Sequence, residues 1–301
     1  MNEIKLKTQS GREMNFIRGG VSSANRHETS LIIIMHGEDF TGKSRFGATG
    51  PETSAYIPLD RKTRFSAINC AMELGRDILL PQVDFVREGN MTVRGGWKAE
   101  EVEVDEKKAA EMDKATRIAY RAHVNQIKNA AWSLHDRSDV KLIQIDLFEQ
   151  FCQDMVFAHY GRTGHKILKI ARTDKIYKDT SEAHQEIVDF INSISDKHLI
   201  LTHRTKDEYY NDVKTGRMTW SGNKFLGHSA NVVVEMVKNR RYVAGDNDDK
   251  KSWHYGLTVQ KCLHNIELEG EAGQLMLKDE MISFPMLAMA VFPGSELGDW
   301  E

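Results

Sequence analysis

The 301-residue sequence is poor in cysteine, in long apolar runs and in net charge. Its three cysteines lie far apart and form no C-x-x-C pair, which argues against a disulfide framework or a cysteine-based zinc site and favours a reducing cytoplasm. No apolar run approaches the length of a membrane span, and residues 1–5 lack a signal-peptide core, so we expect no membrane association. The formal net charge of −3 excludes a global basic field, so a polyanion-binding surface must be a local patch.

The most informative segment that is present is Gly37-Glu38-Asp39-Phe40-Thr41-Gly42-Lys43-Ser44, which follows the apolar run 31–35 directly. It matches the pattern G-x-x-x-x-G-K-[ST] between a buried strand and a helix. The glycines let the loop turn its N–H groups toward an anion, and the following helix adds the partial positive charge of its N-terminus. We expect residues 37–44 and Arg45 to bind a nucleoside triphosphate, with Lys43 at the β- and γ-phosphates and Ser44 on Mg²⁺. The cofactors predicted from this segment are ATP and Mg²⁺.

Strands and helices alternate along the rest of the chain. Residues 1–30 are expected to form an arm or edge strand, with a short strand at 15–17, and residues 31–301 one domain with a largely helical insertion near 62–137. Strands are expected at 55–59, 140–146, 198–202, 230–237, 255–262 and 274–284, and helices at 43–48, 72–80, 100–137, 147–160 and 180–194. Buried strands between helices predict an α/β fold with a mostly parallel sheet, helices on both faces and antiparallel strands toward the C-terminus.

Asp146 ends the apolar strand 140–146 and is the candidate second ligand of Mg²⁺, opposite Lys43 and beside Ser44. Ligands of open α/β sheets bind at the carboxyl ends of the strands, which favours this position. The alternative is that Asp146 caps the helix that follows, because acidic residues are stabilising in a first turn. Glu149 lies on that helix, where we expect a solvated face.

Two further strand ends carry polar residues. Asp60 ends the strand 55–59, and its carboxylate is a candidate base for the attacking water; a turn residue, or an ion pair with a neighbouring arginine, is the alternative. His203 and Arg204 follow the strand 198–202, where a polar side chain beside the γ-phosphate can sense an intact triphosphate. A solvent-facing pair is the alternative for these two residues.

The order of these motifs resembles the RecA/KaiC superfamily of P-loop ATPases, and most of all the small phage-encoded RecA-like proteins that include single-strand annealing AAA ATPases. The resemblance covers residues 30–240 and rests on the loop 37–44, on the strands that lead to Asp60, Asp146 and Arg204, and on Gly222-Asn223-Lys224-Phe225-Leu226-Gly227 before the strand 232–237. It implies a RecA-like core that hydrolyses ATP in the cytoplasm of a phage host.

The resemblance also implies roles for single residues. It places Asp60 in the water-activating position and His203 or Arg204 at the γ-phosphate switch. This chain has Asp where the family has Glu, and Arg204 stands where RecA proteins have a switch glutamine. An arginine there can instead stabilise the charge of the transition state, in its own subunit or in a neighbouring one.

Single-stranded DNA is the partner that the resemblance implies, in phage recombination, repair or replication, with a ring or filament of subunits that share ATP at their edges. Phage single-strand binding or replication proteins are further possible partners. Related proteins bind DNA through two loops, which correspond here to residues 160–178 and 206–224. The candidate contacts are basic or aromatic residues suited to phosphates and base stacking: Arg162, Lys166, Lys169, Arg172, Lys175, Tyr177, Lys178, Arg217 and Lys224. Ordinary solvated loops are the alternative.

Two other functions stay open at this point. A nucleotide-gated assembly or adaptor protein, such as a helicase loader or a KaiC-type ring, would bind ATP and hydrolyse it slowly, and the short acid Asp60 is compatible with that. A small-molecule kinase would need an acceptor pocket and a lid, and the sequence shows no convincing pair of lid arginines.

Overall fold

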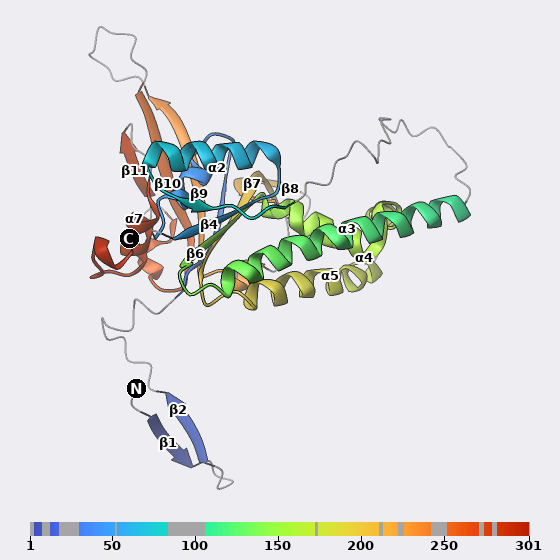
Figure 1. Cartoon of the computed structure of the whole chain (residues 1–301), viewed down its shortest axis with the longest axis horizontal. Coiled ribbons are helices and arrows are strands. Elements are labelled where there is room, and N and C mark those ends of the chain that lie inside the picture. Colours follow the sequence, from blue (N-terminus) through green and yellow to red (C-terminus); the bar gives the residue numbers. More distant parts are fainter. Residues whose placement is uncertain are drawn as a thin grey trace.

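Figure 1 shows the computed structural model of the chain, which describes residues 3–7, 13–17, 30–51, 53–83, 106–171, 174–210, 213–221, 226–241, 252–270, 274–278 and 282–300. Strands β1 (Glu3–Lys7) and β2 (Glu13–Ile17) pair with each other in an antiparallel hairpin, in a sheet of their own. The short strand expected at residues 15–17 is therefore confirmed.

A mixed sheet of nine strands forms the centre of the molecule, in the order β11-β10-β9-β3-β7-β6-β4-β5, with β8 paired to β7. The strands are β3 (Ile32–Gly37), β4 (Ser54–Pro58), β5 (Ile78–Leu79), β6 (Leu142–Asp146), β7 (His198–Tyr210), β8 (Val213–Trp220), β9 (Val232–Arg241), β10 (Ser252–Cys262) and β11 (Gln274–Lys278). The strands from β5 to β9 along this order run parallel, whereas β10 and β11 join antiparallel at the C-terminal side. The predicted α/β class, with a mostly parallel sheet, is confirmed.

Helices cover both faces of the sheet. They are α1 (Lys43–Ala48), α2 (Arg61–Leu74), α3 (Glu106–His135), α4 (Phe148–Ala171), α5 (Asp174–Asn192), α6 (Leu226–Ser229) and α7 (Phe284–Val291), with the 3₁₀ turns η3 (Ile266–Leu268) and η5 (Leu297–Asp299). Helices α3, α4 and α5 lie side by side and extend beyond the sheet (Figure 1); we call them the three-helix projection. Within the described ranges, none of these helices has the length and apolar character that crossing a bilayer requires.

Several expected elements have other bounds in the structure: the helix expected at 147–160 runs to Ala171, and the strand expected at 198–202 runs to Tyr210. The helix expected at 72–80 is wrong, because α2 begins earlier and ends at Leu74, where Gly75 takes a left-handed φ of 63°. The helix expected at 180–194 already begins at Asp174. The strand expected at 274–284 ends at Lys278, and Ser283 caps α7 by accepting a hydrogen bond from the Met286 N–H.

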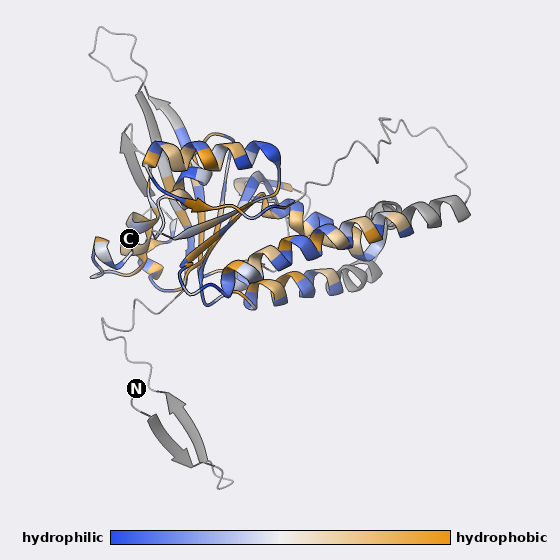
Figure 2. Cartoon of the chain, viewed as in Figure 1, coloured by the Kyte–Doolittle hydropathy of each residue, from blue (hydrophilic) through white to orange (hydrophobic). Residues whose placement is uncertain are grey.

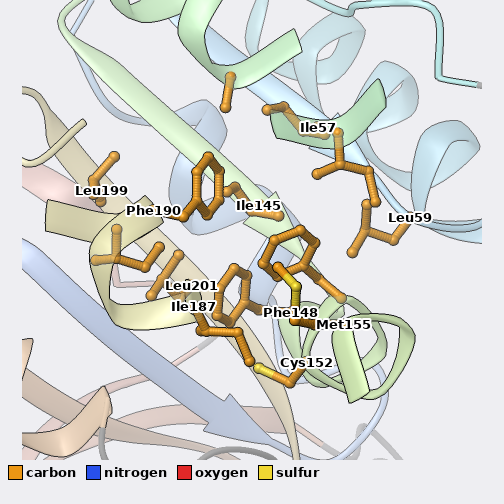
Figure 3. Close-up of a cluster of buried hydrophobic side chains, with 14 of the residues drawn as sticks. Ile57, Leu59, Ile145, Phe148, Cys152, Met155, Ile187, Phe190, Leu199 and Leu201 are labelled. Atoms are coloured by element: carbon orange, nitrogen blue, oxygen red, sulfur yellow. The ribbon is translucent and has the colours of Figure 1, made fainter. Parts of the chain in front are cut away.

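Two layers of buried apolar side chains hold the helices to the sheet. On one face, the strands contribute residues such as Ile145 and Leu201, which pack against Phe148 and Phe190 of α4 and α5 (Figure 3). On the other face, a separate cluster includes Phe46 of α1 and surrounds α7. In Figure 2 the central strands are mostly orange, whereas the three-helix projection alternates between orange and blue. The central strands β3, β4 and β6 are buried on both faces, as strands of a parallel α/β sheet are.

Candidate functional site

The carboxyl ends of β4, β6, β7 and β3 meet along one edge of the sheet, because these strands are parallel neighbours. The loop 37–44 leaves β3 at this edge and enters α1. We call the loop and the adjoining strand ends the P-loop edge. Strand β7 lies between β3 and β6, so its end separates the loop from Asp146.

Two glycines shape the loop. Gly42, which precedes α1, has a left-handed φ of 98°. A Cβ atom on Gly37 would lie 2.4 Å from the carbonyl oxygen of Met236, a backbone atom of the neighbouring strand. Glycine is therefore required at Gly37 for close packing and at Gly42 for its backbone conformation. Phe40, between them, is exposed and also has a positive φ of 64°.

Lys43 lies across the loop. Its Nζ donates to the carbonyl oxygens of Gly37 and Glu38, each at 2.7 Å. Burial lowers the pKa of the Lys43 ammonium, and the nearby carboxylates, Asp146 foremost, oppose that shift. The predicted phosphate-binding lysine is thus held at the loop by bonds that an anion can replace.

Asp146 is buried at the end of β6 and accepts hydrogen bonds on both oxygens. The hydroxyls of Tyr56 and Thr202 donate to Oδ2 and Oδ1, respectively, and Ser44 Oγ lies 3.5 Å from Oδ2. Burial raises the pKa of Asp146, and the hydrogen bonds from Thr202 and Tyr56 oppose the rise. The structure therefore brings together Ser44 and Asp146, the two residues predicted to hold Mg²⁺.

Sequence reasoning missed Tyr56 and Thr202. Each has a polar side chain next to apolar residues of a central strand, and the side chain faces α1 rather than the three-helix projection. Thr202 Oγ1 also accepts a hydrogen bond from the N–H of Leu147, whose φ is 56°. Side chains alternate between the faces of a strand, but only the register between the strands shows that these two residues share the face of Asp146, so the sequence carried no clear signal for them.

Asp60, the predicted water-activating acid, caps a helix. Its Oδ1 accepts a hydrogen bond from the Thr63 N–H at 2.6 Å, and the Thr63 side chain completes a capping box at the start of α2. The carboxylate thus has a structural role at the P-loop edge, and its catalytic role stays a prediction.

The two residues predicted at the γ-phosphate switch point to opposite faces of the sheet. His203 is fully buried, and its Nδ1 donates to the Ser221 carbonyl oxygen at 2.6 Å; burial lowers its pKa to about 3, so the ring is neutral. Arg204 pairs in register with Gly37 of the loop and keeps 61% of its side chain exposed. Of the two, only Arg204 lies beside the loop on the side of Asp146.

Glu149, in the first turn of α4, was expected on a solvated face, and this expectation is wrong. Only 13% of its side chain is exposed, and Arg204 Nε lies 3.1 Å from Oε1. Burial raises the pKa of Glu149 to about 7, and the main-chain N–H of Glu149 and the charge of Arg204 only partly offset this. The P-loop edge therefore holds a second buried carboxylate.

Other predicted loop residues have local roles. Thr41 Oγ1 donates to the Glu38 carbonyl oxygen at 2.9 Å, and Glu38 and Asp39 are exposed. Arg45 points away along α1 and pairs with Glu73 of α2 at 2.6 Å. Its charge is therefore directed toward α2 in this structure.

The two stretches expected to be DNA-binding loops have regular structure. Residues 160–171 continue α4 beyond a break at Gly161 (φ 73°), α5 begins at Asp174, and residues 206–220 lie mostly in the β7–β8 hairpin. The loop assignment is wrong for these ranges: helices α4 and α5 extend through most of the first, and strand β7 continues into a hairpin with β8 in the second. Backbone positions only are described for Arg162, Lys166, Lys169, Lys175, Tyr177, Lys178 and Arg217, and Arg172 and Lys224 lie outside the described residues.

A hollow of about 580 Å³ lies between α3 and α4, and its charged lining is cationic. Lys114, Arg117 and Arg121 contribute from α3, and His159 from α4. Arg121 and His159 bind Glu186 of α5, at 2.8 and 2.7 Å. Lys114 and Arg117 are exposed, and neither forms an ion pair with a described residue. We call this feature the cationic hollow; sequence reasoning missed it, because it placed the DNA contacts in loops.

In the part of the chain that the structure describes, no group of three or more His, Cys, Asp or Glu side chains is arranged to hold a metal by itself. The fit for Mg²⁺ is therefore one carboxylate and one hydroxyl, Asp146 and Ser44, with remaining ligands from phosphate and water. The protein is an α/β protein with a mostly parallel sheet, and the glycine-bounded loop 37–44 lies at one edge of that sheet. No protein-family model matches the chain, and no curated protein matches it either.

Proposed function

We propose that this protein is a RecA-like ATPase that binds Mg-ATP at the P-loop edge and acts on single-stranded DNA. The observation that carries the ATP half is the convergence of Lys43, Ser44 and Asp146 on one end of a parallel sheet. Such a site needs a cation for the phosphates and a hydroxyl and a carboxylate for Mg²⁺. The strand between the loop and Asp146 supports the proposal too, because it brings Arg204 beside both.

In this proposal the loop N–H groups and Lys43 hold the phosphates, and Ser44 and Asp146 hold Mg²⁺. Mg²⁺ would neutralise charge that develops between the β- and γ-phosphates. Tyr56 and Thr202 fix the orientation of the Asp146 carboxylate by their hydrogen bonds to it. Arg204, exposed beside the loop, is placed to meet the γ-phosphate.

The cationic hollow supports the DNA half. Exposed cations that track a phosphate backbone supply most of the affinity of non-specific binding. Lys114 and Arg117 lie on the three-helix projection, as do the backbones of most of the DNA contacts predicted from the sequence. We therefore locate the DNA surface on this projection rather than in loops.

The test is ATPase activity of the full chain with and without single-stranded DNA over a salt series. We expect DNA to stimulate turnover and the stimulation to fade as salt rises, because phosphate contacts are salt-sensitive. Lys43→Ala should reduce turnover roughly 10²- to 10³-fold while the far-ultraviolet circular dichroism is unchanged. Wild-type turnover in Lys43→Ala would remove the site assignment, and salt-independent turnover indifferent to DNA would remove the DNA half.

One observation favours a second candidate, a nucleotide-gated assembly protein with weak hydrolysis. The carboxylate predicted to activate water, Asp60, is engaged as a helix cap. Tight ATP binding with ATP-dependent oligomers and almost no turnover, measured by light scattering and phosphate release, would select this candidate over the ATPase.

A further inference from the structure

Two carboxylates at the P-loop edge have opposite surroundings. Both oxygens of Asp146 accept hydrogen bonds from side-chain hydroxyls, whereas Glu149 has no hydroxyl donor among the described residues: the Arg204 guanidinium, 3.1 Å from Oε1, and the main-chain N–H groups of Glu149 and Arg204 are the groups that favour its charged form. Both Glu149 oxygens are also shielded from solvent. Burying a carboxylate with so few donors is costly, because burial outweighs them and raises its pKa, and such groups concentrate at functional sites.

The charged and titratable groups that face Glu149 come from several elements. Arg204 of β7 forms the ion pair with Oε1, and His203 Nδ1 lies 3.9 Å from Oε2. The His203 ring is neutral and donates elsewhere, to Ser221. The charge of Asp146 raises the pKa of Glu149, and the charge of Glu149 in turn raises the pKa of Lys43. Glu149 therefore lies within the electrostatic reach of the predicted phosphate site, held there by one exposed arginine.

We propose that Glu149 accepts the proton of the attacking water, and that its ion pair with Arg204 keeps this carboxylate from acting as a base until a triphosphate binds. The inference rests on the proposed ATPase function. Arg204 lies in register with the first loop residue, Gly37, so its guanidinium can exchange the carboxylate for the more highly charged γ-phosphate. The exchange frees Glu149 at the moment when its substrate is present.

The water oxygen bonds to the γ-phosphorus, and the bond from that phosphorus to the β–γ bridging oxygen breaks. ADP leaves with the electron pair, and the water proton passes to the Glu149 carboxylate and then to phosphate or solvent. A carboxylate whose pKa burial raises to about 7 is a stronger base than an ordinary one and still largely ionised at pH 7.5 to 8.

This proposal moves the base from Asp60 to Glu149. Asp60 Oδ1 is occupied by the Thr63 N–H, as the cap of α2 requires. Asparagine caps helices about as well as aspartate, so Asp60→Asn removes the acid and keeps the cap. Glu149→Gln keeps the size of its side chain and removes the charge, so the two variants separate the two carboxylates.

The experiment measures Mg-ATP hydrolysis and, separately, ATP binding by filter retention with recovery of the bound nucleotide. Glu149→Gln should lower hydrolysis at least 100-fold, bind ATP no more weakly than wild type, and release intact ATP when denatured. Asp60→Asn should keep hydrolysis within a few-fold of wild type. Glu182→Gln, on the exposed face of α5, is the matched control and should behave as wild type in both assays.

The outcomes are distinguishable. Wild-type hydrolysis in Glu149→Gln, or its loss in Asp60→Asn alone, overturns the role of Glu149 and leaves the ATPase intact. Loss of ATP binding in Glu149→Gln also overturns it, because a base for water is not needed to bind ATP. Absence of ATP binding by the wild-type protein overturns the proposed function itself.

Discussion

The P-loop edge and the three-helix projection each contain a partly buried glutamate, and the pKa values of these two glutamates are shifted in opposite directions. Glu149 is buried beside one arginine, and burial raises its pKa to about 7. Burial also pushes the pKa of Glu186 upward, but hydrogen bonds from Arg121, His159 and Lys128 outweigh it and hold that pKa at about 2. At the P-loop edge, the carboxylate of Glu149 has few groups that favour its charged form. In the projection, three donors keep Glu186 ionised, and Lys114 and Arg117 remain exposed.

The comparison suggests separate tasks. A buried carboxylate with a poor set of partners is poised for chemistry, and it costs stability whenever it is ionised. The carboxylate of Glu186 on α5 accepts from two donors on α3 and one on α4, and it thereby ties the three helices of the projection together. Catalytic residues need a rigid, low-dielectric edge, whereas binding of a polyanion needs mainly exposed charge of one sign.

The largest effect we expect is on the pH dependence of stability. The pKa of Glu149 is higher in the folded protein than its ordinary value of 4.5, so ionisation destabilises the fold progressively from about pH 4.5 to pH 7. Without nucleotide or magnesium, Glu149→Gln should therefore be more stable than wild type at pH 8, by on the order of 2 to 3 kcal/mol, and nearly equal at pH 4.5.

Glu186→Gln is the opposing control for that experiment. The lowered pKa of Glu186 contributes stability that is present above about pH 4.5 and is lost as the pH falls toward 2. This variant should be less stable than wild type at pH 8, by about 1 kcal/mol once solvent screening is allowed for. Urea unfolding at both pH values measures both differences, and shifts of the same sign in the two variants would contradict the contrast.

A smaller effect is expected when the fixed carboxylate of the P-loop edge loses a hydrogen bond. Thr202→Val removes the hydroxyl that donates to Asp146 and accepts from the Leu147 N–H. We expect the apparent affinity for Mg²⁺ in ATP turnover to fall about tenfold, because the Asp146 carboxylate becomes misoriented. Thr205→Val, on the opposite face of β7 and 3.4 Å from His36, is the control. Equal magnesium titrations for both variants would show that the Thr202 hydroxyl has no role at the metal site.

The smallest effect is expected in the cationic hollow. Lys114→Gln with Arg117→Gln should weaken single-stranded DNA binding roughly tenfold near 0.1 M salt and reduce the salt slope by about 1.4, as loss of two phosphate contacts predicts. The charge-matched control is Arg61→Gln with Lys141→Gln, two exposed residues outside the projection. Fluorescence anisotropy measures both, and equal losses would show only a net-charge effect.

Much of the fold followed from the sequence. The apolar runs that became β3, β4, β6 and β7 predicted buried parallel strands, and the glycine-bounded loop predicted the strand–loop–helix at 37–44. The periodic residues from Ala109 to Leu134 predicted α3. These signals are local: periodicity and glycine placement act over one element. The predicted helix at 72–80 is wrong because the apolar residues between Met72 and Leu80 are compatible with a helix or with a strand. Gly75, with its positive φ, ends α2 at that point.

The site was predictable only in part. Ser44 and Asp146 could be paired because a motif and a strand end are visible in the chain. Tyr56, Thr202 and Glu149 could not, because their importance depends on which face each side chain takes and on what lies opposite. His203 and Arg204 make the same point: adjacent in sequence, they point to opposite faces of β7.

The sequence by itself determined that this chain forms a mostly parallel α/β sheet with a glycine-bounded loop at its edge, because hydrophobic periodicity and backbone freedom are properties of short segments. Only the tertiary structure decided which carboxylate is saturated with hydrogen bonds and which is buried with a single arginine. Burial and hydrogen bonding arise between segments distant in the chain, and they set the pKa values and charges on which chemistry depends.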